Sequence, residues 1–295
     1  MNICFIVNPN SGKKKSLKIF NTIRPLLNQK KIDFDYFETE YSGHASNIIQ
    51  NINLKKYHGI IIIGGDGTFH EVVNGLMLKK NKLKIPIGII PGGSGNSFLY
   101  DIDDKNPLSI FKTILKFKKR KIDIIKVKTP NEIIYSINLV GWGLVTDIGE
   151  SAEKFRWLGT SRYTIVSIAE IIKNKNRTAS LLINNQVNNN TFTFIIACNT
   201  KYVGKGMFMA PNAKINDGLL DLIVVKGNLS RITLFKTLPK LFKGTHISDP
   251  NVSYHQVSNF SLKTKNNDLL NIDGELKGNT SIEVELIHNA IEVFN

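Results

Sequence analysis

Two short isoleucine-rich runs, each ending in a cluster of glycines, constrain the fold of this chain more than any other feature. Residues 60–63 are four consecutive isoleucines that lead into Gly64–Thr68, and residues 87–90 lead into Pro91–Asn96. Such β-branched apolar runs are typical of buried strands. Glycines at a strand end leave no Cβ to block a large anion, and Asp66 in the first cluster suggests an accompanying cation. The first hypothesis is a site for phosphate and a metal ion.

Strand and helix patterns alternate along the first 121 residues. The expected strands cover residues 2–7, 33–38, 60–63 and 87–90, and the expected helices cover residues 16–27, 45–52, 69–78 and 108–117. Regular alternation of this kind predicts a mostly parallel sheet covered by helices. Ligands of such sheets bind at the carboxyl ends of the strands, where both glycine clusters are expected to lie.

Near residue 123 the pattern changes to short strands separated by turn clusters such as Thr129–Asn131 and Asn184–Asn185. The expected strands cover residues 122–127, 133–139, 179–183, 191–198, 219–225, 257–262, 269–272 and 282–286. Two helical stretches interrupt them, at about residues 164–174 and 232–242. This half predicts antiparallel sheets arranged as a sandwich.

The chain carries a formal net charge of +15. Anionic partners are therefore expected: a nucleotide, a nucleic acid or an acidic membrane surface. The alternative is that part of the excess lies on solvated faces without function, because the chain is rich in Lys, Asn and Ile. We expect no nucleic-acid partner, since the sequence has no aromatic-basic recognition motif. The sequence leaves open whether the chain forms a homodimer.

Several features bear on location. No apolar run reaches about 18 residues, so no transmembrane helix is expected, and the first residues do not resemble a signal peptide. Cys4 and Cys198 lie in apolar runs and are expected to be buried, reduced thiols. These features predict a cytoplasmic protein. The amphipathic segment 232–242 is expected to pack onto a sheet, with an anionic membrane surface as the alternative.

The segment Asn8–Lys13 connects the first expected strand to the first helix. Backbone N–H groups at a helix start bind anions, and small residues let phosphate approach. The spacing is not that of a Walker A loop. The alternative is that these residues serve only the turn.

The segment Gly64–Thr68 carries more chemical information. Three glycines around Asp66 can wrap a triphosphate, and this acid can hold Mg²⁺ or accept a proton from an attacking hydroxyl. The alternative is an ordinary tight turn in which Asp66 caps the next helix. Glu71 and Asn74 follow at the start of that helix, where they either support the loop or cap the helix.

Taken in order, these motifs resemble those of the diacylglycerol, sphingosine and ceramide kinase superfamily of lipid kinases, over nearly the whole chain. The matching residues are Asn8–Gly12, Thr39 with Gly43–Ala45, Gly64–Thr68 with Glu71 and Asn74–Gly75, Pro91–Asn96, Gly141–Gly143, Arg156–Gly159 with Arg162–Tyr163, Asn216–Asp221 and Asp273–Glu275. The resemblance implies an α/β nucleotide-binding domain over residues 1–123, like that of NAD kinases and phosphofructokinases. It also implies a mainly antiparallel β-sandwich domain over residues 124–284, with the last strand, 285–295, returning to the first domain.

The resemblance further implies roles for individual residues. ATP would contact Asn8, Pro9, Asn10, Ser11, Gly12, Thr39, Gly64, Gly65, Asp66, Gly67, Thr68, Glu71, Gly93, Ser94, Gly95, Asn96, Arg156 and Arg162. Asp66 matches the essential acid of the family, and Glu275 matches the general base proposed for the short bacterial enzymes. Asp123 matches an acid of their metal and water network. Lys214, Asp217 and Leu219 match their structural Mg²⁺ site.

Two positions depart from the family pattern. Ser97 stands where the bacterial network has its second acid, so a network of that type would be incomplete. Segments 91–96 and 153–159 look more like sphingosine and ceramide kinases, whose matching arginines bind ATP phosphates. Without the resemblance, Arg156 and Arg162 would be read as surface partners of Glu150 or Glu153. Gly149 stands where sphingosine kinases have an acid that reads the lipid headgroup.

The resemblance therefore predicts an ATP- and Mg²⁺-dependent kinase, peripheral at an anionic membrane, that phosphorylates a hydroxyl of diacylglycerol, a sphingoid base or a ceramide-like lipid. One alternative is an NAD kinase-like small-molecule kinase, which shares the Gly-Gly-Asp-Gly loop but not Arg156–Gly159 or Asp273–Glu275. The other is a catalytically silent nucleotide or lipid sensor, against which the intact acids Asp66 and Glu275 argue. The lipid itself is not predicted, because acyl-chain pockets consist of ordinary apolar residues.

Overall fold

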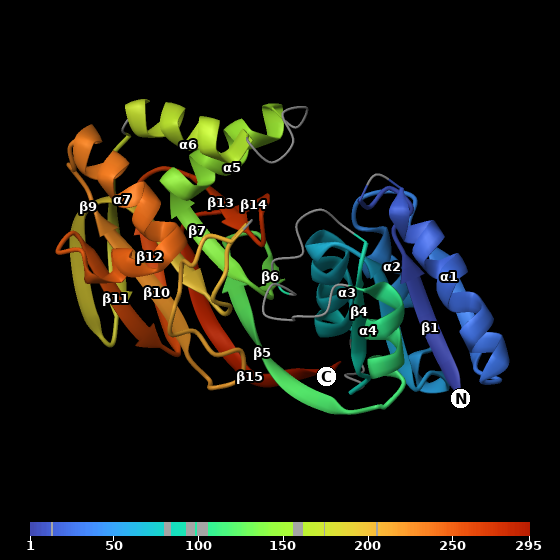
Figure 1. Cartoon of the computed structure of the whole chain (residues 1–295). Coiled ribbons are helices and arrows are strands. Elements are labelled where there is room, and N and C mark those ends of the chain that lie inside the picture. The colour runs from blue at the N-terminus through green and yellow to red at the C-terminus, as the bar shows by residue number, and fades with distance from the viewer. Residues whose placement is uncertain are drawn as a thin grey trace. The chain divides into compact units, whose positions relative to one another are not determined.

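The isoleucine runs form the central strands of a parallel sheet. The computed structural model describes residues 1–12, 14–79, 84–92, 98, 106–155, 162–173, 175–204 and 206–295, without the side chains of residues 153 and 162–164. The chain divides into two units, each described by itself below (Figure 1). Unit 1 comprises residues 1–122 and 289–295, and unit 2 comprises residues 123–288.

Unit 1 contains β1 (Asn2–Val7), β2 (Asp33–Glu38), β3 (Gly59–Gly64), β4 (Ile87–Pro91) and the end of β15 (Ile282–Phe294). These strands lie in the order β15-β4-β3-β1-β2, and every neighbouring pair is parallel. The helices are α1 (Lys15–Gln29), α2 (His44–Asn51), α3 (Asp66–Leu78) and α4 (Pro107–Ile114), with a 3₁₀ turn at Leu54–Lys56.

Alternate residues of each strand in unit 1 point to opposite faces of the sheet, and helices pack onto the apolar side chains there. Phe5 of β1, Ile61 of β3 and Ile90 of β4 share one buried cluster with Phe20 of α1 and Phe111 of α4. Along the chain, the connection from β1 leads to β2, its neighbour on one side in the sheet. The next connection leads to β3, its neighbour on the other side. The carboxyl ends of β1 and β3 therefore form the topological switch point, where open α/β sheets bind ligands.

The last residues of the described chain complete unit 1. Val293 of β15 pairs with Ile87 of β4, and the backbone N–H of Asn295 donates to the carbonyl oxygen of Lys118 (2.8 Å). The ring of Phe294 packs edge-on against Phe117, with the ring centroids 5.3 Å apart. The strand that starts in unit 2 thus ends as a member of the unit 1 sheet.

Unit 2 consists mainly of antiparallel strands. Its strands are β5 (Lys119–Lys128, which starts in unit 1), β6 (Ile133–Ser136), β7 (Leu139–Gly143), β8 (Arg177–Ile183), β9 (Gln186–Cys198), β10 (Leu220–Lys226), β11 (Val252–Val257), β12 (Asn259–Thr264), β13 (Leu269–Ile272), β14 (Glu275–Asn279) and the start of β15. The order is β14-β13-β7-β9-β8-β12-β15, with β10 joining β9 to β11. The pairs within unit 2 are antiparallel.

The helices of unit 2 are α5 (Leu144–Lys154), α6 (Arg162–Lys173) and α7 (Arg231–Lys243), with a 3₁₀ turn at Thr245–Ser248. Ile195 of β9 faces a core formed by strands alone, whereas Ile196 faces a second core that includes Ile171 of α6 and Leu234 of α7. The three helices therefore cover one face of the strand layer (Figure 1). The predicted combination of an α/β domain and a mainly antiparallel β-sandwich is confirmed.

Some element boundaries differ from the sequence prediction. The single strand expected at 133–139 is two strands, because the carboxylate of Asp273 takes the backbone N–H groups of residues 137–139. The strand expected at 257–262 is β12, which starts at Asn259, and the preceding strand β11 was not predicted; Ser258 separates the two. Helix α5 and strand β14 were not predicted. Both follow sharp glycine-containing turns, at Gly143 and Gly274, whose φ angles are +88° and +89°.

Candidate active site

Two of the predicted loops meet at the switch point of unit 1. The amide Nδ2 of Asn8, at the end of β1, donates to Oγ1 of Thr68 (3.1 Å), and its backbone N–H donates to the carbonyl of Ile63 (3.1 Å). The side-chain Oδ1 of Asn8 accepts from the backbone N–H of Asn10 (3.0 Å), and its carbonyl accepts from Ser11 (3.1 Å). Asn8 thus shapes the turn that includes Pro9 and Gly12 and joins it to the Gly64–Thr68 loop.

Close packing explains Gly64 of this loop and Gly92 at the end of β4. A Cβ atom at Gly64 would lie 2.7 Å from Oγ1 of Thr68, and one at Gly92 would lie 2.2 Å from Oγ of Ser16. The backbone N–H of Gly92 donates to the carbonyl of Gly64 (2.8 Å). The start of α1, the end of β3 and the end of β4 therefore approach one another more closely than any side chain would allow.

Asp66 is the first residue of α3, and Gly65 occupies the capping position. The alternative that Asp66 caps this helix is therefore wrong. Its Oδ1 accepts from the backbone N–H of Phe98 (3.3 Å). The capping residues of the two helices, Gly65 of α3 and Lys14 of α1, make no side-chain cap hydrogen bond. The N–H groups at these two neighbouring helix starts therefore receive no side-chain cap from their own capping residues, an arrangement that suits an anion.

Glu71 supports the loop that follows β2. Its Oε1 accepts from the backbone N–H of Gly43 (2.8 Å), and its Oε2 accepts from that of Ala45 (3.1 Å). Thr39, at the start of this loop, is buried and donates its N–H to the carbonyl of Val7 (2.9 Å). Glu71 was expected to support the Gly64–Thr68 loop or to cap α3, and its observed hydrogen bonds to the loop after β2 are neither of these two roles. Its predicted contact with ATP stays a prediction.

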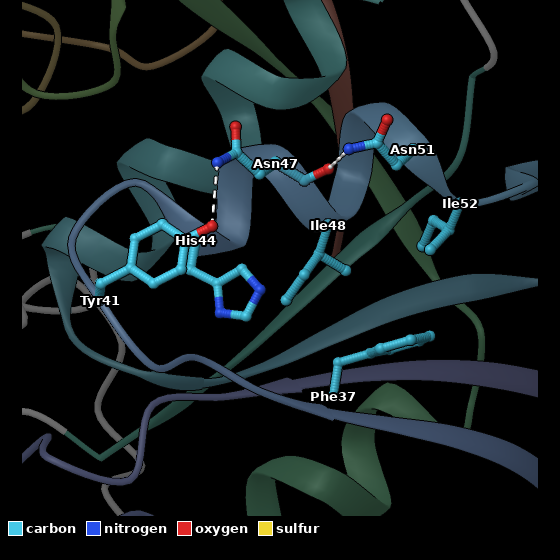
Figure 2. A pocket seen from close by; sticks show the side chains of 7 residues that line it. All are labelled: Phe37, Tyr41, His44, Asn47, Ile48, Asn51 and Ile52. Atoms are coloured by element: carbon cyan, nitrogen blue, oxygen red, sulfur yellow. Dashed lines mark hydrogen bonds between the residues drawn. The ribbon is translucent and has the colours of Figure 1, made fainter.

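A shallow pocket of about 370 Å³ lies beside this loop (Figure 2). Its lining consists of Phe37, Tyr41, His44, Asn47, Ile48, Asn51 and Ile52. The rings of Tyr41 and His44 stack with their centroids 4.5 Å apart, and the amide of Asn47 donates to the Tyr41 hydroxyl (3.3 Å). His44 also accepts from the backbone N–H of Glu40 through Nδ1 (3.0 Å), so it acts here as a turn and packing residue.

In unit 2, Asp123 organises the predicted metal-binding loop. It is fully buried, and its Oδ2 accepts from the backbone N–H of Gly218 (2.8 Å) while its Oδ1 lies 3.0 Å from Nδ1 of His288. Within the loop, Oδ1 of Asp217 accepts from the N–H of Leu219 (3.1 Å). The structure therefore brings Lys214, Asp217 and Leu219 together on the loop that Asp123 holds.

The donor set of this loop fits Mg²⁺ in kind. It offers one carboxylate, Asp217, together with backbone carbonyls, which are the hard oxygen ligands that Mg²⁺ prefers. In the described part of the chain no three acidic, His or Cys side chains gather as a metal cluster. Nearby Asp221 is buried, and burial raises its pKa even though the Tyr254 hydroxyl (2.6 Å) and the Gln256 amide (3.2 Å) donate to it. Asp221 is accordingly a structural acid.

The Asp273–Glu275 motif separates into two roles. Asp273 lies in the turn between β13 and β14, and its carboxylate accepts from Oγ of Ser136 (2.7 Å) and from three consecutive backbone N–H groups, those of residues 137–139. Glu275, the first residue of β14, is partly exposed and pairs with Lys277 (2.5 Å). The sequence motif did not reveal that Asp273 is structural, since its partners lie more than 130 residues away.

The position of the missing headgroup acid is packed against a strand. A Cβ at Gly149 of α5 would lie 2.8 Å from the side-chain nitrogen of Asn271 in β13. The neighbouring acid Asp147 is engaged elsewhere, because its Oδ1 accepts from Nη2 of Arg177 (2.7 Å). Gly149 has no carboxylate and that of Asp147 is paired with Arg177, so neither residue offers an unpaired carboxylate at this position.

Several predicted site residues lie outside the described structure. These are Gly93, Ser94, Gly95, Asn96 and Arg156, together with the side chain of Arg162, whose backbone starts α6. Glu150, one of the alternative partners of these arginines, pairs with Lys154 (3.3 Å). Among the described helices, none is long and apolar enough to cross a membrane.

Comparison with known proteins gives consistent matches over both units. Residues 2–127 match the diacylglycerol kinase catalytic domain family, and residues 138–295 match the YegS C-terminal NAD kinase beta sandwich-like domain family. Sphingosine kinase 1 of Arabidopsis thaliana is 30% identical over 87% of this chain, which spans 63% of the length of that protein.

Two solved structures share the fold. A diacylglycerol kinase of Bacillus anthracis superposes with a TM-score of 0.81 and 25% identity, over 99% of this chain and 96% of that one. An NAD kinase of Archaeoglobus fulgidus, solved in complex with ATP, superposes with a TM-score of 0.54 and 14% identity, over 100% of this chain and 94% of that one. The second likeness concerns the fold alone.

Proposed function

Because the chain belongs to the diacylglycerol kinase catalytic-domain family of lipid kinases, we propose that it transfers the γ-phosphoryl group of ATP to a hydroxyl group of a lipid. The observation that carries the proposal is the pair of neighbouring helix starts whose capping residues, Lys14 and Gly65, make no side-chain cap, with Asp66 in the first turn of α3. The hydrogen bond between Asn8 and Thr68 joins the two loops that lead to them. Backbone N–H groups there suit phosphates, and the carboxylate suits an accompanying cation.

The reaction requires little covalent chemistry from the protein. The lipid hydroxyl oxygen attacks the γ-phosphorus, the new O–P bond forms, and the bond to the bridging oxygen breaks, so that the electron pair leaves with ADP. The hydroxyl proton passes to a carboxylate, and Asp66 and Glu275 are the two candidates. Most of the rate then comes from positioning and from neutralising negative charge.

Mg²⁺ fits this chemistry in two places. At Asp66 it would accompany the ATP phosphates and neutralise their charge, and at Asp217 it would stabilise the 214–219 loop. The arginines Arg156 and Arg162 would add positive charge near the transferred phosphoryl group, because guanidinium groups bind phosphate with two parallel hydrogen bonds.

The test is phosphorylation of a mixed lipid extract with labelled ATP, followed by identification of the labelled product. A labelled lipid is expected with the wild-type chain, and Asp66→Asn is expected to lower turnover by about 10²-fold or more while leaving the fold intact. The matched control is Asp33→Asn, which changes an exposed acid at the start of β2 and should have no effect.

NAD serves as a competing acceptor in the same assay, because the fold is shared with an NAD kinase. Labelled NADP without labelled lipid would replace the lipid kinase proposal with the small-molecule alternative. Binding of ATP and lipid without any labelled product would support a silent sensor. Near-normal turnover by a folded Asp66→Asn variant would remove Asp66 from the mechanism and leave Glu275 as the candidate base.

A further inference from the structure

Strand β2 leaves one edge of the unit 1 sheet open. It is the last strand in the order of that sheet, and among the described strands it pairs with β1 alone, in an unbroken register over all six residues. The backbone N–H groups of Asp33 and Thr39 donate to the carbonyls of residues 1 and 7 (2.9 Å each). In a parallel pair the backbone groups of successive residues point to opposite sides, so those of Phe34 and Tyr36 point away from β1. A row of outward backbone groups is a template for one more strand.

The pocket beside the Tyr41–His44 loop is a groove along this edge (Figure 2). Phe37 of β2 forms one wall, and Ile48 and Ile52 form the opposite wall, from α2 and the residue that follows it. A compact ligand buries most of its surface when it binds, which a shallow groove does not permit. An extended chain that adds to β2 can instead place its alternate side chains in the groove.

Helix α3 holds α2 at both ends and so fixes the width of the groove. At the start of α2, the carboxylate of Glu71 accepts from two backbone N–H groups, those of residues 43 and 45. At the end of α2, Nζ of Lys79 donates to three carbonyls, those of residues 49, 50 and 52 (2.9, 2.7 and 3.0 Å). A Cβ at Gly75 of α3 would lie 2.8 Å from the carbonyl of Ser46, so the two helices are in close contact. The groove is therefore formed before a ligand binds, which lowers the entropy lost on binding.

The open edge is acidic although the chain is basic. Residues 33–40 contain four acids and no lysine or arginine, whereas the whole chain carries a formal charge of +15. Asp35 already pairs with a lysine of the neighbouring 3₁₀ turn (2.7 Å). Glu38 and Glu40 are exposed, and in the described part of the chain no basic side chain pairs with their carboxylates. These two carboxylates favour a partner that carries positive charge.

The amides on the rim of the groove favour the same kind of partner. Nδ2 of Asn51 donates to the carbonyl of Asn47 (2.8 Å), and Nδ2 of Asn47 donates to the hydroxyl of Tyr41 (3.3 Å). The nitrogen of each amide is thus engaged, which leaves its oxygen as an acceptor at the rim (Figure 2). Lysine and arginine side chains supply only donors, so they match these oxygens.

We propose that the open edge of β2 and this groove bind a basic peptide segment of a partner protein, in an extended conformation, as an added strand. The backbone of the peptide pairs with Phe34 and Tyr36, and its alternate apolar side chains lie against Phe37. Its basic side chains meet Glu38 and Glu40. A second copy of the chain fits less well, because pairing two β2 edges brings their acids together. Such binding is independent of the proposed phosphoryl transfer, because these residues lie outside the predicted ATP contacts.

The test is fluorescence polarisation of the full chain with short labelled peptides. A peptide that alternates lysine and valine is expected to bind with a Kd in roughly the micromolar range. A peptide that alternates lysine and proline carries the same charge but lacks the N–H donors at proline, so it should not bind. A peptide that alternates glutamate and valine should not bind either. Equal binding of the two lysine peptides would show attraction by charge alone and would overturn the proposal.

Amide exchange locates the bound peptide even if no variant folds. The lysine–valine peptide should slow exchange at Phe34 and Tyr36 and leave Asp35 and Phe37 unchanged, since the N–H groups of these two already face β1. Binding without slower exchange at Phe34 and Tyr36 would place the peptide elsewhere and defeat the proposal. If these two amides are already protected in the free chain, and the chain self-associates in sedimentation equilibrium, the edge is a homodimer interface and the peptide proposal is wrong.

Substitutions test the two kinds of side chain. Glu38→Gln/Glu40→Gln should weaken binding of the lysine–valine peptide roughly fivefold. Its matched control, Glu283→Gln/Glu285→Gln, removes the same charge from exposed acids of unit 2 and should bind as wild type does.

Phe37→Ser should weaken binding of the same peptide about tenfold, because an apolar wall of the groove is lost. Its control is Val187→Ser, at a 60% exposed position of β9. Thermal unfolding followed by circular dichroism verifies that every variant is folded. Unchanged peptide binding by the folded Glu38→Gln/Glu40→Gln and Phe37→Ser variants would overturn the proposal.

Discussion

Replacing Asp273 with Asn is expected to destabilise unit 2 strongly, although the change is nearly isosteric. The Oδ1 atom of Asp273 accepts from Oγ of Ser136 (2.7 Å) and from the backbone N–H groups of Asn138 (2.8 Å) and Leu139 (3.1 Å). Its Oδ2 accepts from the N–H of Ile137 (2.9 Å). The side chain is almost fully buried, so water cannot replace these bonds.

The size of this loss of stability follows from the hydrogen bond that the Asn side chain cannot accept. Asn can keep its oxygen at the Oδ1 position, but its NH₂ group then faces the N–H of Ile137, which leaves two donors opposed. Loss of one hydrogen bond to a charged acceptor costs about 1.5–3 kcal/mol, and the stranded donor costs a further 1–3 kcal/mol. The left-handed backbone at this position (φ +54°) suits Asn as well as Asp, so no strain is added. We expect a loss of about 3 kcal/mol or more, which for a unit of this size is roughly 6–12 °C in melting temperature.

Urea unfolding followed by tryptophan fluorescence measures this loss, because Trp142 is buried in the strand core of unit 2. The companion variant is Glu275→Gln, two residues further on. Its partly exposed carboxylate pairs with Lys277, so its removal should cost less than about 1 kcal/mol. The same variant should lose phosphorylation activity if Glu275 is the base. A stability change below about 1 kcal/mol for Asp273→Asn would refute the reasoning.

Three further variants test other contacts. Glu71→Gln is expected to loosen residues 39–45, which would be seen as faster amide exchange there, and to raise the KM for ATP about tenfold, because a charge-assisted hydrogen bond is lost. Unchanged exchange would show that the loop does not depend on Glu71. Arg156→Ala and Arg162→Ala should each weaken ATP use more than lipid binding, and unchanged kcat and KM for ATP in both would make them surface charges. Burial lowers the pKa of His246, so protonation of this side chain opposes folding. The free energy of unfolding should therefore fall as the pH drops below about 6.5, and His246→Gln should remove this pH dependence of the urea midpoint.

The parallel half of the fold could be predicted because its signals are local. The isoleucines of β3, and Ile87 and Ile90 of β4, are buried on both faces of the sheet, so an apolar run is sufficient to identify each strand. The glycines that follow them mark the strand ends, and parallel order then brings Asn8 and Thr68 to one edge. Only the contacts themselves, such as the bonds from Glu71 to the 43–45 segment, required the structure.

The antiparallel half was less predictable because its boundaries are set by distant residues. Nothing within residues 133–139 predicts a break, since the break is made by the carboxylate of Asp273. The orientation of α6 was equally hidden. Val166 and Ile171 define one apolar face of this helix, and the exposed residues Ile165, Ile168 and Ile172 define another. The buried hydrogen bonds of Glu170 decide which face turns inward.

The return of β15 to unit 1 has a consequence for synthesis of the chain. Residues 289–295 supply a strand neighbour to β4, and Phe294 lies against Gly59 and Gly88, where a Cβ would come within 2.8 and 3.3 Å of its ring. Ribosomes make residues 1–122 first, but this unit cannot close its sheet until all of unit 2 has been translated. Unit 1 therefore cannot reach its final form ahead of unit 2, unlike an N-terminal domain that folds while the rest is still being made. A nascent chain stalled before residue 289 should expose the edge of β4 to chaperones.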